Sequence, residues 1–293
     1  MRGFRLMKKL TTKKHWDSTY QGFGKFSTRY NSIKNKVILI LRKILGQRVQ
    51  IVMQDFSRHI LVEKFFKNHL EINNTSRIIE IGCAPGNFLL NLNKEFNCVP
   101  YGVDYSKTGV HVNQNLFRKY NLDPENIVCA DVFSNEYQNQ YHEFYDVVIS
   151  RNFFEHFQEL DRVIWAHLNL LKPGGKLLIT IPNLKGLNFF FTKLFNQAQI
   201  PQHNLQIMDN DYFSSLFDSF GVSKVLCKYY GMFNFYIYGM RNSTRFKPLL
   251  TLGYGFQMIL NIIFHFLFKK RTFESRLYSP YLVYIGIKKE KSD

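Results

Sequence analysis

The sequence predicts an α/β fold built on a doubly wound, largely parallel sheet. Short apolar runs of strand length alternate with longer segments of helical periodicity through the middle of the chain. The first run, Arg77–Ile81, leads directly into a turn with a glycine at each end, and a helical pattern follows from Phe88. Glycine allows a ligand to approach the backbone, and a helix start offers free N–H donors, so this order predicts a cradle for a nucleotide-like ligand.

The spacing of this turn narrows the choice of ligand. It reads Glu80-x-Gly82-x-x-x-Gly86, with Cys83 and Ala84 between the two glycines. Dinucleotide-binding proteins require Gly-x-Gly-x-x-Gly, in which the third glycine has its own packing role. The sequence therefore departs from the dinucleotide fingerprint.

Further strands are expected, each followed by polar residues that could reach a ligand. They are predicted at residues 99–104, 126–130, 145–150 and 176–181. Asp104 ends the first of these, where a carboxylate can accept two hydrogen bonds from a ribose diol. Asp131 follows the second, and Arg151 and Asn152 follow the third.

The last part of the fold is predicted as a helix at 209–220 and strands at 222–230 and 281–287. Residues 184–208 show no regular pattern, and a connection of that length usually carries function or forms a lid. His203 and Asn204 lie in it and are candidates for contacting a substrate, although a surface histidine would have the same sequence signature.

Taken together, these motifs resemble those of class I S-adenosylmethionine (AdoMet)-dependent methyltransferases, from roughly Trp16 to Lys288. The matching motifs, in order, are Glu80-x-Gly82-x-x-x-Gly86, Asp104, Asp131, Glu155-His156 and Leu171-Lys172-Pro173-Gly174-Gly175. Ala84 departs from the pattern, because the family most often has glycine there. The resemblance implies a Rossmann-like seven-stranded sheet with an antiparallel last strand, and AdoMet as the cofactor.

The resemblance also implies how the cofactor is held. The turn with Gly82, Cys83, Ala84 and Gly86 would pass under the methionine part, and Glu80 would fix the turn or the amino group. Asp104 would take the ribose hydroxyls, and Tyr105 would lie against the adenine. Asp131 and Val132 would contact the adenine amino group, unless Asp131 is a helix cap. Arg151 and Asn152 would flank the methyl group.

Methyl transfer is an in-line displacement that requires the acceptor to be oriented and water to be excluded. An alcohol acceptor also needs a base, and histidine is the usual choice. His156 and His203 are the catalytic candidates. In many members of the family the Glu-His pair instead lies at a helix start and orders its loop, and Glu155 could also be a helix cap or a metal contact. No metal is expected.

Composition points to anionic partners. Lys and Arg number 39 against 22 Asp and Glu, which gives a net charge of +17. Such a charge favours nucleic acid or an acidic membrane surface. The four cysteines, Cys83, Cys98, Cys129 and Cys227, lie in or beside predicted strands and are interpreted as reduced core residues of a cytoplasmic protein. No secretion signal is recognised.

We expect four segments. Residues 1–74 form a basic, helical lid, with an amphipathic helix at 33–45 and a second helix at 54–69 that covers the ligand. Residues 75–240 form the methyltransferase core. Residues 241–275 form an apolar helical insertion. Residues 276–293 supply the last strand and a basic tail.

Within the insertion, residues 248–268 carry no formal charge and are long enough to span a bilayer. Gln257, Asn261 and His265 nevertheless recur every four residues, and the strand at 281–287 must return to the same sheet. Three interpretations stay open. The segment is a helix or hairpin, broken near Gly253-x-Gly255, that lies on a membrane surface, or it packs on its own core or a twin subunit, or it is a true span.

The function expected is O-methylation of a small-molecule, sugar or lipid-linked acceptor near the inner face of a membrane. No Asn/Asp-Pro-Pro-Tyr/Phe motif follows the fourth strand, where the chain reads Ser150-Arg151-Asn152-Phe153, and no cysteine nucleophile lies nearby. One alternative is an RNA methyltransferase that binds phosphates through its basic surface. The other is a non-catalytic protein that docks on membranes. A homodimer is also compatible with the sequence.

Overall fold

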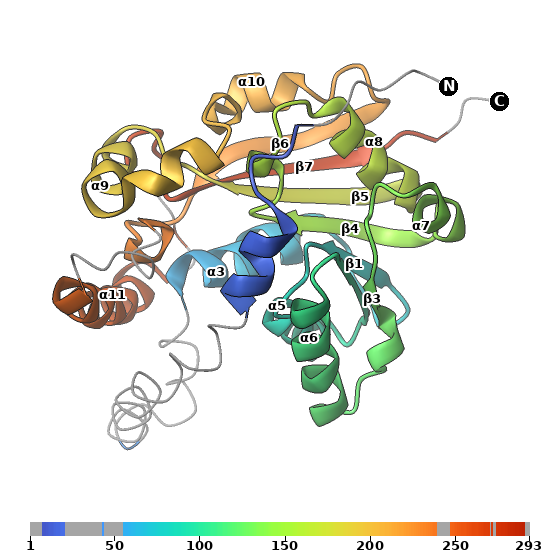
Figure 1. Cartoon of the computed structure of the whole chain (residues 1–293), viewed down its shortest axis with the longest axis horizontal. Helices are drawn as coiled ribbons and strands as arrows, with labels where there is room; N and C mark the ends of the chain where they lie inside the picture. The colour runs from blue at the N-terminus through green and yellow to red at the C-terminus, as the bar shows by residue number, and fades with distance from the viewer. Residues whose placement is uncertain are drawn as a thin grey trace.

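Seven strands form one sheet in the order β3-β2-β1-β4-β5-β7-β6 in the computed structural model (Figure 1). The strands are β1 (Arg77–Ile81), β2 (Val99–Asp104), β3 (Ile127–Cys129), β4 (Tyr145–Arg151), β5 (Leu171–Pro182), β6 (Val222–Tyr230) and β7 (Tyr281–Lys288). Strands β1 to β5 pair in parallel, whereas β7 is antiparallel to both β5 and β6. The predicted Rossmann-like sheet with an antiparallel last strand is confirmed. The structure describes residues 8–20, 43, 55–238, 247–269, 271 and 274–290.

Helices cover both faces of the sheet, because neighbouring residues of each central strand point to opposite sides. Ile79 and Val148 pack into the core that includes α8, whereas Ile78 and Val147 pack into the core that includes the 56–66 helix. The α-helices are α3 (Phe56–Ile60), α4 (Lys67–His69), α5 (Asn87–Phe96), α6 (Lys107–Lys119), α7 (Asn135–Gln140), α8 (Asp161–Leu170), α9 (Leu187–Asn196), α10 (Asn210–Ser215) and α11 (Lys247–Phe268). A π-helical segment, η2 (Leu61–Phe66), joins α3 to α4.

Short 3₁₀ turns complete the connections: η3 (Pro124–Asn126), η4 (Phe154–His156), η5 (Gln197–Gln202), η6 (Gln206–Met208) and η7 (Phe235–Tyr238). The expectation that residues 184–208 lack regular structure was wrong, because α9, η5 and η6 occupy most of them. Leu187, Phe191 and Phe195 recur at helical spacing, and the phenylalanines pack on the core. The predicted helix at 209–220 is shorter, and β5 begins five residues before the predicted Lys176.

The N-terminal expectations have mixed outcomes. The predicted helix at 33–45 lies outside the described residues, except for Lys43. The predicted helix at 54–69 is seen from Phe56 to His69, packed on the sheet, but it does not line the ligand cavity described below. Residues 13–20 are helical. Among the cysteines, Cys83 and Cys98 are buried as expected, whereas Cys129 is exposed and not a core residue.

Helix α11 is continuous, so the expected break near Gly253 and Gly255 was wrong. Two helical glycines cost about 1 kcal/mol each relative to alanine, which a long helix tolerates. The helix carries its polar residues inward: Gln257 and Asn261 are 1% and 2% exposed, while Ile259 is 52% and Leu267 70% exposed. Within the described part of the chain, the structure contains no helix long and apolar enough to cross a membrane.

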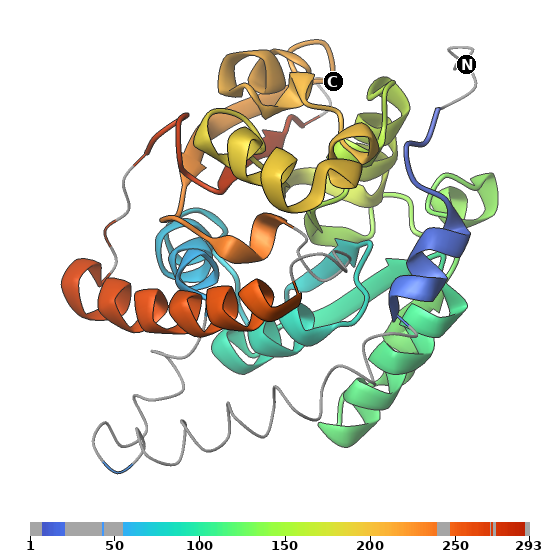
Figure 2. The ribbon, with the colours of Figure 1, turned by 60° about the vertical axis from the view of Figure 1, so that its left-hand side comes forward.

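The buried side chains of Gln257 and Asn261 on α11 form hydrogen bonds with backbone N–H groups of neighbouring segments. The Gln257 side-chain oxygen accepts a hydrogen bond from the Phe235 backbone N–H (2.9 Å), and Asn261 accepts one from the Phe56 backbone N–H (3.4 Å). Gln257 also donates to Asn261 (3.0 Å). These contacts fix α11 against α3 and η7 by polar groups, and Ile259 and Leu267 remain exposed. Figure 2 shows α11 running along the outside of the molecule.

Candidate active site

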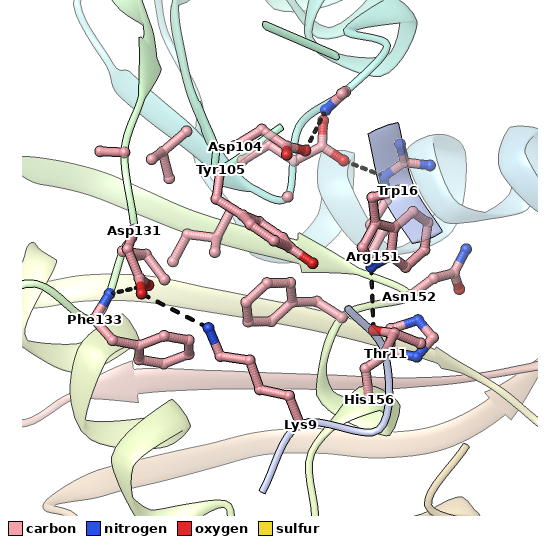
Figure 3. A pocket seen from close by; sticks show the side chains of 18 of the residues that line it. Lys9, Thr11, Trp16, Asp104, Tyr105, Asp131, Phe133, Arg151, Asn152 and His156 are labelled. Carbon is pink, nitrogen blue, oxygen red and sulfur yellow. Dashed lines mark hydrogen bonds and ion pairs between the residues drawn. The ribbon is translucent and has the colours of Figure 1, made fainter. Parts of the chain in front are cut away.

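A cavity of about 430 Å³ lies at the carboxyl ends of β1, β2 and β4 (Figure 3). Parallel sheets of this type bind ligands at that edge, where the strand order reverses. Its lining includes ten of the residues predicted for the site: Glu80, Gly82, Ala84, Asp104, Tyr105, Asp131, Val132, Arg151, Asn152 and His156. The predicted residues Cys83, Gly86 and His203 are not among its lining residues.

The glycine turn under the cavity has the geometry that its spacing predicts. Gly82 and Gly86 both have positive φ (72° and 80°), and a Cβ on Gly86 would lie 1.8 Å from the Asn113 side-chain oxygen. Cys83 points into the core, where it accepts a hydrogen bond from the Asn113 amide (3.3 Å). Ala84 is not among the residues with positive φ, so alanine serves there without strain.

Glu80 and Arg151 form a partly buried ion pair at the floor of the cavity. The Arg151 Nε donates to Glu80 Oε1 (2.8 Å), while Glu80 Oε2 is buried and has no hydrogen-bond partner among the described residues. Burial raises the pKa of Glu80, and the Arg151 guanidinium opposes this effect. Arg151 also lies 3.7 Å from the ring centre of Phe88. The free Oε2 leaves one acceptor available to a donor on a ligand.

Asp104 is fixed by backbone donors on two sides. Its two oxygens accept hydrogen bonds from the Ser106 N–H (2.9 Å) and the Ala84 N–H (3.3 Å). It is almost fully buried yet lines the cavity, with Tyr105 beside it. Burial raises the pKa of Asp104, and the two N–H donors lower it. A carboxylate held this way keeps lone pairs for hydroxyl donors.

Asp131 lies at the opposite end of the cavity, half exposed. Its side chain accepts a hydrogen bond from the Phe133 N–H (3.1 Å) and lies 3.7 Å from the Lys9 ammonium. The helix that follows is capped by Ser134 and not by Asp131, so the N-cap alternative fails. Asp131 instead caps the turn before that helix, and Val132 in this turn lines the cavity.

Residues 8–20 close the cavity from the side, and five of them line it: Lys9, Thr11, Trp16, Thr19 and Tyr20. The segment is held by hydrogen bonds from the Leu10 N–H to the His156 carbonyl (2.8 Å) and from the Tyr20 hydroxyl to the Ala84 carbonyl (3.3 Å). The sequence predicted a lid without assigning contacts. Trp16 and Tyr20, an aromatic pair one helical turn apart, were the available signal.

The two candidate catalytic histidines lie side by side, although 47 positions separate them in the sequence. Their ring centres are 5.0 Å apart, and Trp16 packs edge-on against His156 at 5.2 Å. His156 lines the cavity and His203 lies behind it. Burial and the neighbouring His203 lower the pKa of His156 to about 3, and burial lowers the pKa of His203. Both imidazoles are therefore neutral near pH 7.

Asn204 attaches the segment that carries His203 to the end of β4. Its backbone N–H donates to the Glu155 carbonyl (2.6 Å), and its side-chain amide donates to the Phe157 carbonyl (3.0 Å). The Asn204 side chain is buried, and its hydrogen bonds go to backbone carbonyl groups. The prediction that it contacts substrate therefore has no support in this geometry.

A seven-stranded sheet of this order, with a glycine turn and acidic residues around one cavity, defines a nucleotide-cofactor enzyme of the class I methyltransferase type. The sequence matches the family model described as "Methyltransferase domain" over residues 53–226. The chain therefore belongs to this family and is an AdoMet-dependent methyltransferase. Comparison with curated proteins finds no significant match.

Solved structures show the same fold at low sequence identity. The structure of the MccD protein matches with a TM-score of 0.53 and 16% identity, covering 80% of this chain and 96% of the other. The YcgJ protein from Bacillus subtilis matches with a TM-score of 0.52 and 15% identity, covering 80% and 99%.

The cavity fits the cofactor of the family. AdoMet carries an ammonium and ribose hydroxyls, and the cavity offers the unpartnered Glu80 Oε2 and the fixed Asp104 carboxylate as acceptors. The backbone at Gly82 passes beneath the cavity without a side chain. These acceptors are of the kind that the ammonium and the ribose hydroxyls of the cofactor require.

Because Trp16 lines the cavity, its fluorescence should report ligand binding. The chain has two tryptophans, and Trp165 on α8 is partly exposed and is not among the cavity-lining residues. Titration with S-adenosylhomocysteine should change the emission of the wild-type protein and of Trp165→Phe. The response should disappear in Trp16→Phe, and its persistence there would contradict the placement of residues 8–20.

Proposed function

We propose that this methyltransferase transfers a methyl group to a hydroxyl of a small, apolar or lipid-linked acceptor at a membrane surface. Two observations support the proposal: the neutral histidine that lines the cavity, and the outward apolar face of α11. Each is considered in turn.

The cofactor orientation that we propose follows the acceptors of the cavity. Glu80 would take the ammonium of the methionine part, beside the turn of Gly82, Cys83, Ala84 and Gly86. Asp104 would take the ribose hydroxyls. Tyr105 would lie against the adenine, and Asp131 and Val132 would contact its amino group. Arg151 and Asn152 would flank the methionine end, so the methyl group would point toward His156.

AdoMet supplies a methyl group on a positively charged sulfur. In the transfer, the acceptor oxygen forms a bond to the methyl carbon, the carbon–sulfur bond breaks toward sulfur, and the hydroxyl proton must leave. His156 Nδ1 lies 3.0 Å from the Gln202 carbonyl, which can only accept, so Nδ1 carries the proton and Nε2 has a lone pair. Burial lowers the pKa of His156 and makes it a weak base, so a hydroxyl more acidic than that of a sugar, such as a phenol, would suit it better.

The membrane part of the proposal is based on the exposed face of α11. Its outward residues are Phe256, Ile259, Ile263, Phe266 and Leu267. Lys269 and Arg271 follow directly, and the whole chain carries +17. An apolar helix face next to basic residues is typical of helices that lie in the interface of an anionic membrane. Helix α9 adds Phe190 and Leu194 at the same end of the molecule (Figures 1 and 2).

The net positive charge of the chain also supports a second class of acceptor, RNA, because basic residues bind phosphates. Nucleic-acid binding would draw on the basic residues themselves and would weaken steeply with salt. Burial of apolar side chains in lipid would be retained at high salt to a larger extent. Salt dependence therefore distinguishes the two partners.

Asp104→Ala should weaken AdoMet binding by about 1–3 kcal/mol, the usual cost of losing a charged hydrogen-bond partner. Isothermal titration calorimetry measures this directly. The matched control is Asp123→Ala, which removes an exposed carboxylate from the start of η3 and should bind AdoMet normally. An Asp104→Ala variant with wild-type affinity would remove the ribose assignment.

Replacing Ile259 and Ile263 together by Asp should abolish co-flotation with anionic liposomes and leave AdoMet affinity unchanged. The control replaces Val112 and Val225, which are exposed to a similar degree on α6 and β6, by Asp and adds the same charge elsewhere. The control variant should float. If the α11 variant also floats, the helix is not the membrane contact.

A further inference from the structure

We propose that Glu155, His156 and His203 form a binding site for one divalent transition-metal ion, with Zn²⁺ the ion that suits it best. The sequence led to the expectation of no metal. In the structure, Glu155 and His156 of η4 lie beside His203, which directly follows η5. The sequence does not show this proximity, because His203 is 47 positions after His156.

Glu155, His156 and His203 each have one potential metal-ligating atom close to those of the other two residues. One ligating atom from each side chain, a carboxylate oxygen and two ring nitrogens, lies within 4.8 Å of the other two. His156 Nε2 is 3.8 Å from Glu155 Oε1, too far for a hydrogen bond. Metal–ligand bonds of about 2 Å would fill such a gap after small side-chain rotations.

The hydrogen bonds of His156 and His203 leave a nitrogen lone pair on each ring that could bind a metal ion. His156 Nδ1 bonds to the Gln202 carbonyl (3.0 Å) and His203 Nδ1 to the Gln199 carbonyl (2.8 Å). A carbonyl only accepts, so each Nδ1 carries the ring proton and each Nε2 carries a lone pair. Metal-binding histidines almost always make this second hydrogen bond, because it fixes the tautomer and the ring orientation.

The environment of the Glu155 carboxyl group favours a bound cation. The residue is fully buried, and neither carboxylate oxygen has a hydrogen-bond partner among the described residues. A buried carboxyl group without partners costs free energy, and the neighbouring imidazoles offer lone pairs in place of protons. A bound cation would compensate all three groups at once.

The backbone around the three residues is held from two sides. Asn204, next to His203, donates to the Glu155 and Phe157 carbonyls, and the Leu10 N–H donates to the His156 carbonyl. The ligand side chains therefore lie on fixed backbone, as a preorganised site requires.

Two imidazoles and one carboxylate match the ligands of catalytic zinc sites, which leave a fourth position open. Iron(II) uses the same ligand set, but zinc requires no oxidant or reductant. His156 lines the cavity, so the open position would face it. A hydroxyl bound there would have a lowered pKa. With the metal bound, His156 Nε2 would be a ligand and not a base, so in the proposed O-methylation the metal would replace His156 in promoting loss of the hydroxyl proton. Metal binding itself does not depend on that proposal.

The test uses the full-length protein with Cys129→Ser, which removes the exposed cysteine. After treatment with a chelator and its removal, calorimetric titration with Zn²⁺ should show one equivalent bound. Glu155→Gln and His203→Gln should each weaken binding by more than about tenfold. His111→Gln on α6, an exposed histidine outside the cluster, should bind Zn²⁺ as the parent does.

Cobalt(II) gives a second readout that does not depend on heat. One equivalent of Co²⁺ should produce the visible absorption of a four- or five-coordinate ion in the parent protein, and this absorption should be lost in His203→Gln. Circular dichroism should confirm that each variant is folded. If the folded parent binds no metal, or if all three variants bind alike, the site does not exist. In either case the AdoMet affinity stays as measured, so failure here leaves the methyl-transfer proposal intact.

Discussion

The partly buried ion pair between Glu80 and Arg151 is the interaction on which the site depends. It joins the carboxyl ends of β1 and β4, the two central strands, and Phe88 at the start of α5 packs against the guanidinium. Glu80 is almost fully buried, so removing Arg151 would leave a carboxylate uncompensated in the interior, which is unfavourable. The pair therefore fixes the cavity floor, where Glu80 Oε2 has no hydrogen-bond partner in the described part of the chain.

Chain segments far apart in sequence meet at His156. The 8–20 segment bonds to its backbone, Trp16 packs on its ring, and the segment after α9 places His203 beside it. The cofactor cavity and the proposed metal site thus share one residue. Contact between these segments orders one wall of the cavity together with the 8–20 segment that closes it. Such convergence is expected where loops from several strands meet at one sheet edge.

The sequence was most informative where local chemistry decides the structure. Strands β1, β2 and β6 agree with prediction, and Glu80, Gly82 and Asp104 lie at the cavity because strand, turn and helix start follow within a few residues. Helix α9 was missed because residues 184–208 were interpreted as an irregular connection, although Leu187, Phe191 and Phe195 recur at helical spacing. The orientation of α11 could not be predicted, because the pattern reveals two faces but not which one meets Phe235 and Phe56. The meeting of His156 and His203 depends on long-range packing that leaves no mark in the sequence.

The most direct test incubates cell extract with the purified protein and AdoMet carrying a labelled methyl group, and then separates lipid, small-molecule and nucleic-acid fractions. The account predicts label in the organic extract, bound as an alkali-stable methyl ether. Label in the nuclease-sensitive fraction would contradict it, because the basic surface would then serve RNA and not a membrane-associated acceptor.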